Sequence, residues 1–219
     1  MTSERCYACD EAATTEEHVP PKVIFPERKD LREVGSVVED LRVGLITVPA
    51  CQSHNNAFSK DDEYTAFAIA MNMGNHPVAV HQWHTKVRRA LKRNPRLRNL
   101  FTRNTKEVRR DGRMLFAVEI DRTRVASVMK RAARGLLFHH GYGRLDIELQ
   151  CHFPSMVFPD GSNADEAVLG VLCQQLNHLA WQGANPQAFR YQIHKPEARY
   201  LIRLQFYEGF EAIVTSTPP

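Results

Sequence analysis

The sequence predicts a protein of the α+β class. Of its 219 residues, 43% are hydrophobic, which is enough apolar material to bury a substantial core. Apolar residues recur at three- and four-residue steps over 76–93, which is a helical pattern. Three short runs rich in β-branched and aromatic residues follow one another at 189–195, 199–207 and 210–216. Successive strands joined by short turns indicate an antiparallel sheet in the C-terminal part.

The N-terminal elements begin with a short knuckle formed by the Cys-x-x-Cys of residues 6–9. The chain then runs to His18, after which Pro20 and Pro21 forbid a regular helix. Residues 27–42 are polar and predict a loop with room for one short charged helix.

A strand and a helix follow this loop. The β-branched run over 43–50 predicts a strand that Pro49 ends. Asn55 and Asn56 supply the side chains that commonly start a helix, and Gly74 is expected to stop it. The N-terminal order is therefore strand, loop, strand, helix.

The middle of the chain predicts one helix and one hairpin. The apolar positions of 76–93 leave the basic residues on the outside of the helix, and Pro95 closes it. Segments 105–110 and 113–119 are separated by an Asp-Gly pair, the strongest short signal for a β-hairpin.

The C-terminal half continues with a helix over 121–141, a strand over 145–153 and a helix over about 164–182. The three strand-like runs described above complete it. We expect these elements to form an α+β domain with antiparallel strands.

Charge is distributed very unevenly along the chain. Residues 1–85 contain 7 Lys/Arg and 13 Asp/Glu, residues 86–135 contain 17 and 4, and residues 136–219 contain 5 and 8, so the blocks carry net charges of −6, +13 and −3. Such a basic block suits a polyanion. Six basic residues of the helical part are the candidates for phosphate contacts: Arg88, Arg89, Lys92, Arg93, Arg96 and Arg98.

The cysteines indicate a metal rather than disulfides. There are five, an odd number, and the sequence has neither a signal-peptide pattern nor a run of eighteen apolar residues, so we expect a soluble, cytoplasmic protein that does not enter a membrane. Cys6 and Cys9 form one closely spaced pair, and Cys51 and His54 form another. Three thiolates and an imidazole are ligands that tetrahedral zinc prefers. The intervening 41 residues are too many for a DNA-reading finger, so the expected zinc is structural.

Within the two pairs, Glu17 and His18 precede Val-Pro-Pro, and Asn55 follows the last ligand. This pattern, over about residues 4–73, resembles the zinc-bearing HNH or ββα-metal endonucleases, which include phage enzymes that resolve branched DNA. The resemblance implies a ββα-metal module with His18 as general base, and with Glu17 and Asn55 as further catalytic residues. His54 departs from the cysteine usual at its position, and Glu17 from the usual aspartate.

The implied chemistry is hydrolysis of DNA phosphodiester bonds, by nicking or by cutting both strands. Histidine accepts a proton near neutral pH. The resemblance further implies that Glu17 and Asn55 hold Mg²⁺ or another divalent ion, which prefers oxygen ligands. The zinc would act at a distance by fixing the segment that carries His18 against the helix start that carries Asn55.

The predicted organisation is a nuclease module at 1–75, a basic helical segment at 76–104 and a C-terminal α+β domain of unassigned role at 105–219. We expect DNA as the partner, in a setting such as phage defence or restriction, with a homodimer or a partner protein held through the C-terminal domain. Two alternatives stay open. One is a zinc module that binds nucleic acid without cutting it, and the other is a nuclease that cuts RNA.

Overall fold

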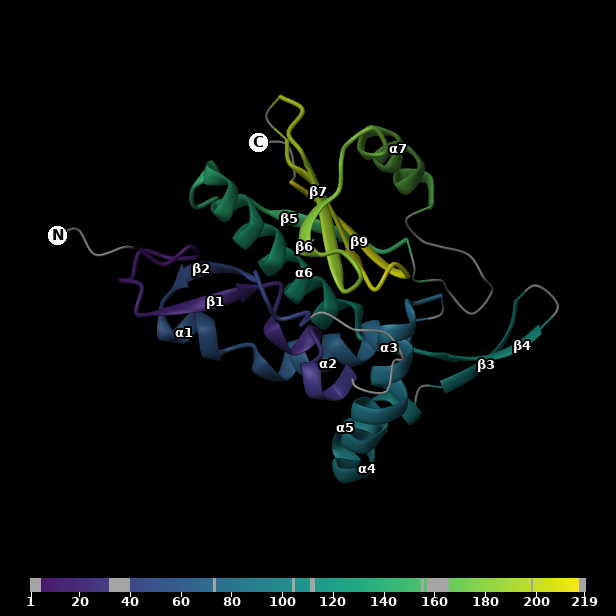
Figure 1. Cartoon of the computed structure of the whole chain (residues 1–219). Coiled ribbons are helices and arrows are strands. Elements are labelled where there is room, and N and C mark those ends of the chain that lie inside the picture. The colour runs from purple at the N-terminus through teal and green to yellow at the C-terminus, as the bar shows by residue number, and fades with distance from the viewer. Residues whose placement is uncertain are drawn as a thin grey trace.

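The structure, a computed structural model, describes residues 5–31, 40–72, 74–103, 105–110, 113–154, 156, 166–197 and 199–216 (Figure 1). It mixes helices with antiparallel sheets, as predicted for an α+β protein. None of the helices in these ranges is long and apolar enough to cross a membrane.

The N-terminal elements form a small two-stranded sheet followed by helices. Strand β1 (Thr15–Val19) pairs antiparallel with β2 (Ile46–Ala50), with His18 opposite Thr47. Pro49 lies inside β2 and does not end it, and its carbonyl accepts the backbone N–H of Tyr7. The order of strand, strand and helix agrees with the sequence pattern.

The helix expected after the strand is divided in two. Helix α1 (Gln52–Asn56) begins directly after Cys51, and α2 (Ser59–Ala70) begins three residues after α1 ends. Asn55 therefore lies inside α1, and the expectation that it starts a helix is wrong. The helix begins earlier, at Gln52, directly after Cys51. The first turn of a helix brings residues three apart to one face, so this early start places His54 beside Cys51.

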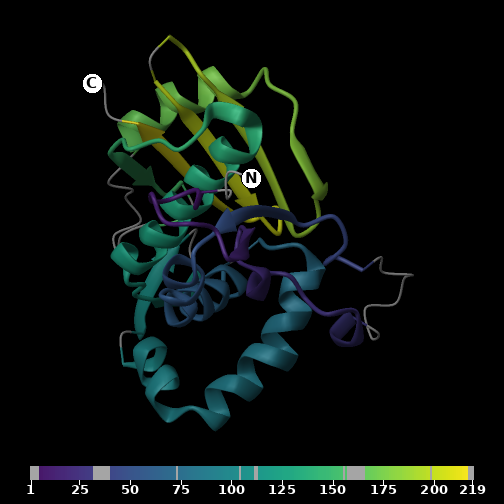
Figure 2. The same cartoon turned by 90° about the vertical axis from the view of Figure 1, so that its left-hand side faces the viewer.

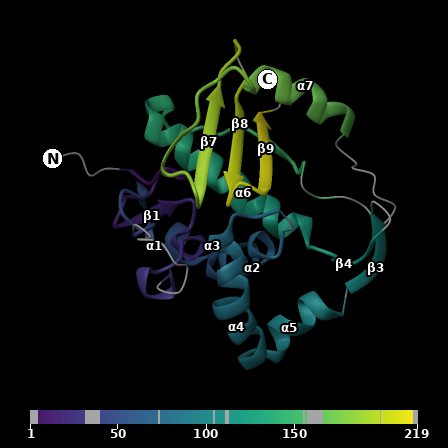
Figure 3. The ribbon, with the colours of Figure 1, turned by 45° about the vertical axis from the view of Figure 1, so that its right-hand side comes forward.

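The basic part of the chain projects from the rest (Figures 2 and 3). Helix α3 (Pro77–Gln82) continues through a π-helical stretch (Trp83–Val87) into α4 (Arg88–Arg93), as the apolar pattern over 76–93 predicted. Helix α5 (Pro95–Thr102) follows, with the Asn94 side chain accepting from the Leu97 N–H. The predicted hairpin is present as β3 (Thr105–Arg110) and β4 (Arg113–Val118).

The C-terminal part contains a five-stranded antiparallel sheet in the order β5-β9-β8-β7-β6. Its elements are α6 (Arg122–Leu137), β5 (Leu149–His152), α7 (Glu166–Leu176), β6 (Gln182–Asn185), β7 (Phe189–His194), β8 (Leu201–Phe206) and β9 (Phe210–Ser216). The helix expected to reach residue 182 ends at Leu176 instead. Residues 182–185 form an edge strand that the sequence did not indicate, because Gln-Gly-Ala-Asn carries no alternating apolar pattern.

Helix α6 is the central element of the molecule. One side contacts α2, β1 and β2, and the other contacts β5 and β9 of the large sheet. At the crossing with β1, a Cβ on Gly135 would lie 2.5 Å from a methyl of Val19, so only glycine allows this approach. A single buried cluster therefore joins the N-terminal and C-terminal parts, while α7 covers the opposite face of the sheet with its own smaller apolar cluster.

Candidate metal centre and its surroundings

The four residues expected to bind zinc converge in the structure. The ligand atoms of Cys6, Cys9, Cys51 and His54 all lie within 4.8 Å of one another. His54 Nδ1 is 3.1 Å from Cys51 Sγ and 3.7 Å from Cys6 Sγ, and Cys9 Sγ is 3.8 Å from Cys51 Sγ. A tetrahedron with zinc–sulfur bonds of about 2.3 Å has edges of about 3.8 Å. The cluster is thus of the right size and chemistry for zinc.

Local backbone contacts bring the two pairs of ligands together. The Ala8 N–H donates to Cys6 Sγ at 3.4 Å, which closes the knuckle around its first cysteine. The Tyr7 N–H donates to the Pro49 carbonyl at 2.8 Å, which attaches the knuckle to β2 immediately before Cys51. The cluster therefore joins the knuckle to the start of α1, and α1 in turn packs against β1.

His18 and Asn55 lie on these two adjoining elements. The side chains of both are partly buried, and neither makes a hydrogen bond to any residue that the structure describes. Burial lowers the pKa of His18 below its ordinary value, and the positive charges of Lys22 and Arg42 lower it further, while Glu16 opposes them. The imidazole is therefore neutral at pH 7 and free to accept a proton.

Glu17 faces the other side of β1. Consecutive residues of a strand point to opposite faces, so Glu17 shares its face with Val19, and His18 shares its face with Glu16. The Glu17 carboxylate accepts a hydrogen bond from the Tyr7 hydroxyl at 2.9 Å and lies 3.1 Å from Arg131 Nε on α6. The structure thus separates two residues that the sequence pattern grouped together.

Arg131 also pairs with Asp62 of α2 and lies over the ring of Phe58. The three charged side chains are largely buried, with 11% of Arg131, 9% of Glu17 and 17% of Asp62 exposed. Burial raises the pKa of both carboxyls, and the Arg131 charge opposes this rise. One guanidinium thereby compensates two buried acids on different elements.

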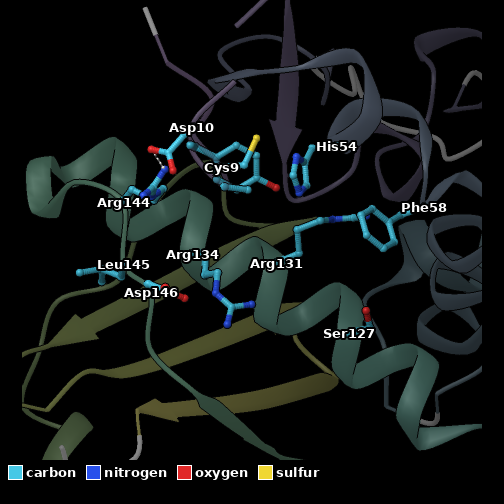
Figure 4. A pocket seen from close by; sticks show the side chains of 12 residues that line it. Cys9, Asp10, His54, Phe58, Ser127, Arg131, Arg134, Arg144, Leu145 and Asp146 are labelled. Carbon is cyan, nitrogen blue, oxygen red and sulfur yellow. Dashed lines mark hydrogen bonds and ion pairs between the residues drawn. The ribbon is translucent and has the colours of Figure 1, made fainter. Parts of the chain in front are cut away.

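A cavity of about 380 Å³ lies beside the metal centre (Figure 4). Cys9 and His54 form one wall, and α6 and the loop after it form the other with Arg131, Arg134 and Arg144. Arg144 Nη1 pairs with Asp10 at 2.6 Å, and Arg134 donates to the Ile147 carbonyl. Two of the four residues that could hold the metal, Cys9 and His54, therefore border this cavity. Sequence reasoning did not place Arg131 or Asp62 in the site, because only the fold brings them to Glu17.

The six basic residues expected to contact phosphates are exposed on α4 and α5. None of Arg88, Arg89, Lys92, Arg93, Arg96 and Arg98 forms an ion pair with a residue in the described ranges. The buried residues of α5 are Leu97 and Phe101, which fix its opposite side to the body. The projecting helices therefore present uncompensated positive charge.

No protein-family model, no curated protein and no solved structure matches this chain.

Proposed function

We propose that the protein is a metal-dependent endonuclease of the HNH type that hydrolyses phosphodiester bonds of DNA. The observation that carries the proposal is the convergence of Cys6, Cys9, Cys51 and His54. This cluster supports a structural zinc that holds α1 against β1, and so holds Asn55 near the strand that carries His18. The β1–β2 pair followed by α1 supports a ββα-metal module in residues 1–75.

His18 is the proposed general base. Its neutral imidazole suits removal of a proton from the attacking water, which a protonated ring could not do. A zinc ion held by these three thiolates and one imidazole would have a complete tetrahedral set of ligands, so it would serve the structure and would not bind the substrate.

A catalytic divalent ion would supply charge stabilisation for the developing phosphorane oxygens. Of the two expected oxygen ligands, Asn55 has a free side-chain carbonyl, whereas Glu17 is engaged by Arg131 and Tyr7. Glu17 does not fit this role as it stands, because its carboxylate would first have to give up both contacts. Glu16 is the acid on the His18 face and is exposed, so it is the better-placed oxygen donor.

The projecting basic helices support nucleic acid as the substrate. Exposed arginines and lysines without acidic partners bind phosphates without reading sequence. DNA is favoured over RNA here by the motif resemblance.

One observation favours the second candidate, a zinc module that binds nucleic acid without cutting it. Glu17 at the position of the usual metal ligand is held by an ion pair, as would be expected after loss of catalysis. The two candidates differ in whether His18 matters for anything beyond packing.

The deciding experiment compares wild-type protein with His18→Ala on supercoiled plasmid, linear duplex DNA, single-stranded DNA and RNA, each with and without Mg²⁺. We expect Mg²⁺-dependent cleavage of DNA by the wild type, no cleavage by His18→Ala, and equal DNA binding and thermal stability of both. His81→Ala is the matched control, since His81 lies on α3 away from β1. Cleavage by His18→Ala at the wild-type rate would remove His18 as the base, and binding without cleavage by the wild type would establish the non-catalytic candidate.

A further inference from the structure

The β3–β4 ribbon is separate from the rest of the fold. Its strands pair with each other in continuous register from Thr105 opposite Val118 to Arg110 opposite Arg113. Neither strand makes more than slight contact with another element of the described chain. Figures 1 and 3 show the ribbon extending outward beyond α5. A single two-stranded hairpin is only marginally stable in water. Among its described side chains, Val118 at the base of the ribbon packs against the core, so a ribbon that extends beyond this base is unusual unless a partner contacts it.

The ribbon's charge matches that of the neighbouring helices. Residues 105–118 contain four Lys/Arg and two Asp/Glu. Arg109 is exposed and forms no ion pair with a described residue, and Lys106 is paired only with the exposed Glu119. Across from Arg109 in the register lies Met114, which is 61% exposed. An exposed apolar side chain beside a free arginine suits the edges of bases as well as phosphates.

The dimensions of the ribbon favour the major groove of duplex DNA. Two paired strands lie about 4.8 Å apart, and six residues extend about 20 Å, so the ribbon is narrow and long. The major groove of undistorted B-form DNA, about 12 Å wide and about 8.5 Å deep, admits such a ribbon, whereas the minor groove, about 6 Å wide, admits one only when the duplex is bent and the groove opened. In A-form RNA the major groove is too narrow for side chains to read.

We propose that the β3–β4 ribbon enters the major groove of duplex DNA while α4 and α5 contact the adjoining backbone. The substrate is therefore B-form duplex DNA and not double-stranded RNA. This inference rests on the nucleic-acid binding in the proposed function but not on the cleavage, so binding alone tests it.

The test is methylation interference in the absence of added divalent ions, where cleavage does not take place. A 30-bp duplex lightly methylated with dimethyl sulfate carries methyl groups at guanine N7 in the major groove and at adenine N3 in the minor groove. We expect N7-methylated molecules to be depleted from the bound fraction and N3-methylated molecules to be retained. We also expect double-stranded RNA of the same sequence to bind at least about tenfold more weakly than the DNA.

The variant Lys106→Gln, Arg109→Gln should lose the N7 interference and most of the preference for DNA. The matched control is Lys195→Gln, Arg199→Gln, which removes two charges at the β7–β8 turn of the large sheet and should retain both. Three results would overturn the proposal. They are interference confined to adenine N3, equal affinity for the RNA duplex, and N7 interference that persists in the ribbon variant. If the wild type shows N7 interference but never cuts DNA, the result supports binding in the major groove and contradicts the proposed nuclease activity.

Discussion

Arg131 of α6 lies 3.1 Å from the carboxylate of Glu17 in β1, and the same guanidinium pairs with Asp62 of α2. One side chain thus ties the N-terminal strand and helix to the helix that carries the C-terminal sheet. The motif associates Glu17 with catalysis, but in this fold Glu17 is part of the contact between the two halves of the chain.

Removing Arg131 should destabilise the protein strongly. In Arg131→Met two buried carboxyl groups lose their positive partner, and an uncompensated buried charge costs about 3–5 kcal/mol. The free energy of unfolding in urea measures the loss. Arg124→Met is the control, because its pair with Asp61 is more exposed and should contribute less than about 1 kcal/mol. Equal effects of the two variants would show that the Arg131 contacts are not what joins the two halves. Adding Glu17→Gln and Asp62→Asn to Arg131→Met should restore part of the loss.

Zinc should be present at about one ion per chain and should stabilise the N-terminal part. The variant Cys9→Ser, Cys51→Ser leaves two of four ligands, so it should purify with far less zinc and unfold at a lower temperature. Elemental analysis of protein purified without chelator measures the first effect and calorimetry the second. Cys173→Ser, in α7, is the control and should keep its zinc. Undiminished zinc in the double variant would show that another site holds the ion.

The pKa of His18 should lie below its ordinary value of about 6.5. Burial disfavours the charged imidazolium, so the neutral base persists to lower pH, and the acidic limb of any cleavage profile should lie correspondingly low. Titration of the His18 ring by NMR, assigned by its absence in His18→Ala, gives the value directly. Glu16→Gln removes a charge that raises this pKa and should lower it further, whereas Glu17→Gln, on the opposite face, should change it less. A His18 pKa above 7 would contradict the burial argument.

These contacts mark where the sequence was informative and where it was not. The spacing of Cys6, Cys9, Cys51 and His54 predicted their convergence. Two ligands separated by two residues can bind the same zinc ion, so two such pairs together supply its four ligands. The Asp-Gly pair at 111–112 lies outside the described residues, but the pairing of β3 with β4 that it predicted is present, because turn preferences depend on local sequence. The ion pair between Glu17 and Arg131 could not be predicted, since Arg131 is more than a hundred residues away and reaches Glu17 only through the packing of α6. The same holds for Gly135, whose small size matters only where α6 crosses β1.

Gly135→Ala should destabilise the protein although alanine favours a helix. The added Cβ would lie 2.5 Å from one Val19 methyl and 3.0 Å from the other, and valine is stiff about χ1. Overpacking costs about 1–3 kcal/mol, against a gain of about 1 kcal/mol in helix propensity, so we expect a net loss of about 1 kcal/mol. Combining Gly135→Ala with Val19→Ala should show a favourable coupling in a double-mutant cycle of unfolding free energies. Simple additivity of the two changes would mean that α6 and β1 do not approach this closely.

The basic helices should bind DNA mainly through its phosphates. Arg89, Lys92 and Arg93 are exposed on α4, and each phosphate contact on a duplex contributes about 0.9 to the slope of log affinity against log salt. Replacing all three by alanine should therefore flatten that slope by about 2.7 if each makes one contact. Affinity should fall alike for unrelated DNA sequences, because phosphates carry no sequence information. The control Lys195→Ala, Arg199→Ala tests whether the loss of positive charge anywhere on the protein is enough to flatten the slope. A slope that stays unchanged in the α4 variant, or falls equally in the control, would mean that α4 is merely solvated and that the backbone contacts lie on another part of the surface.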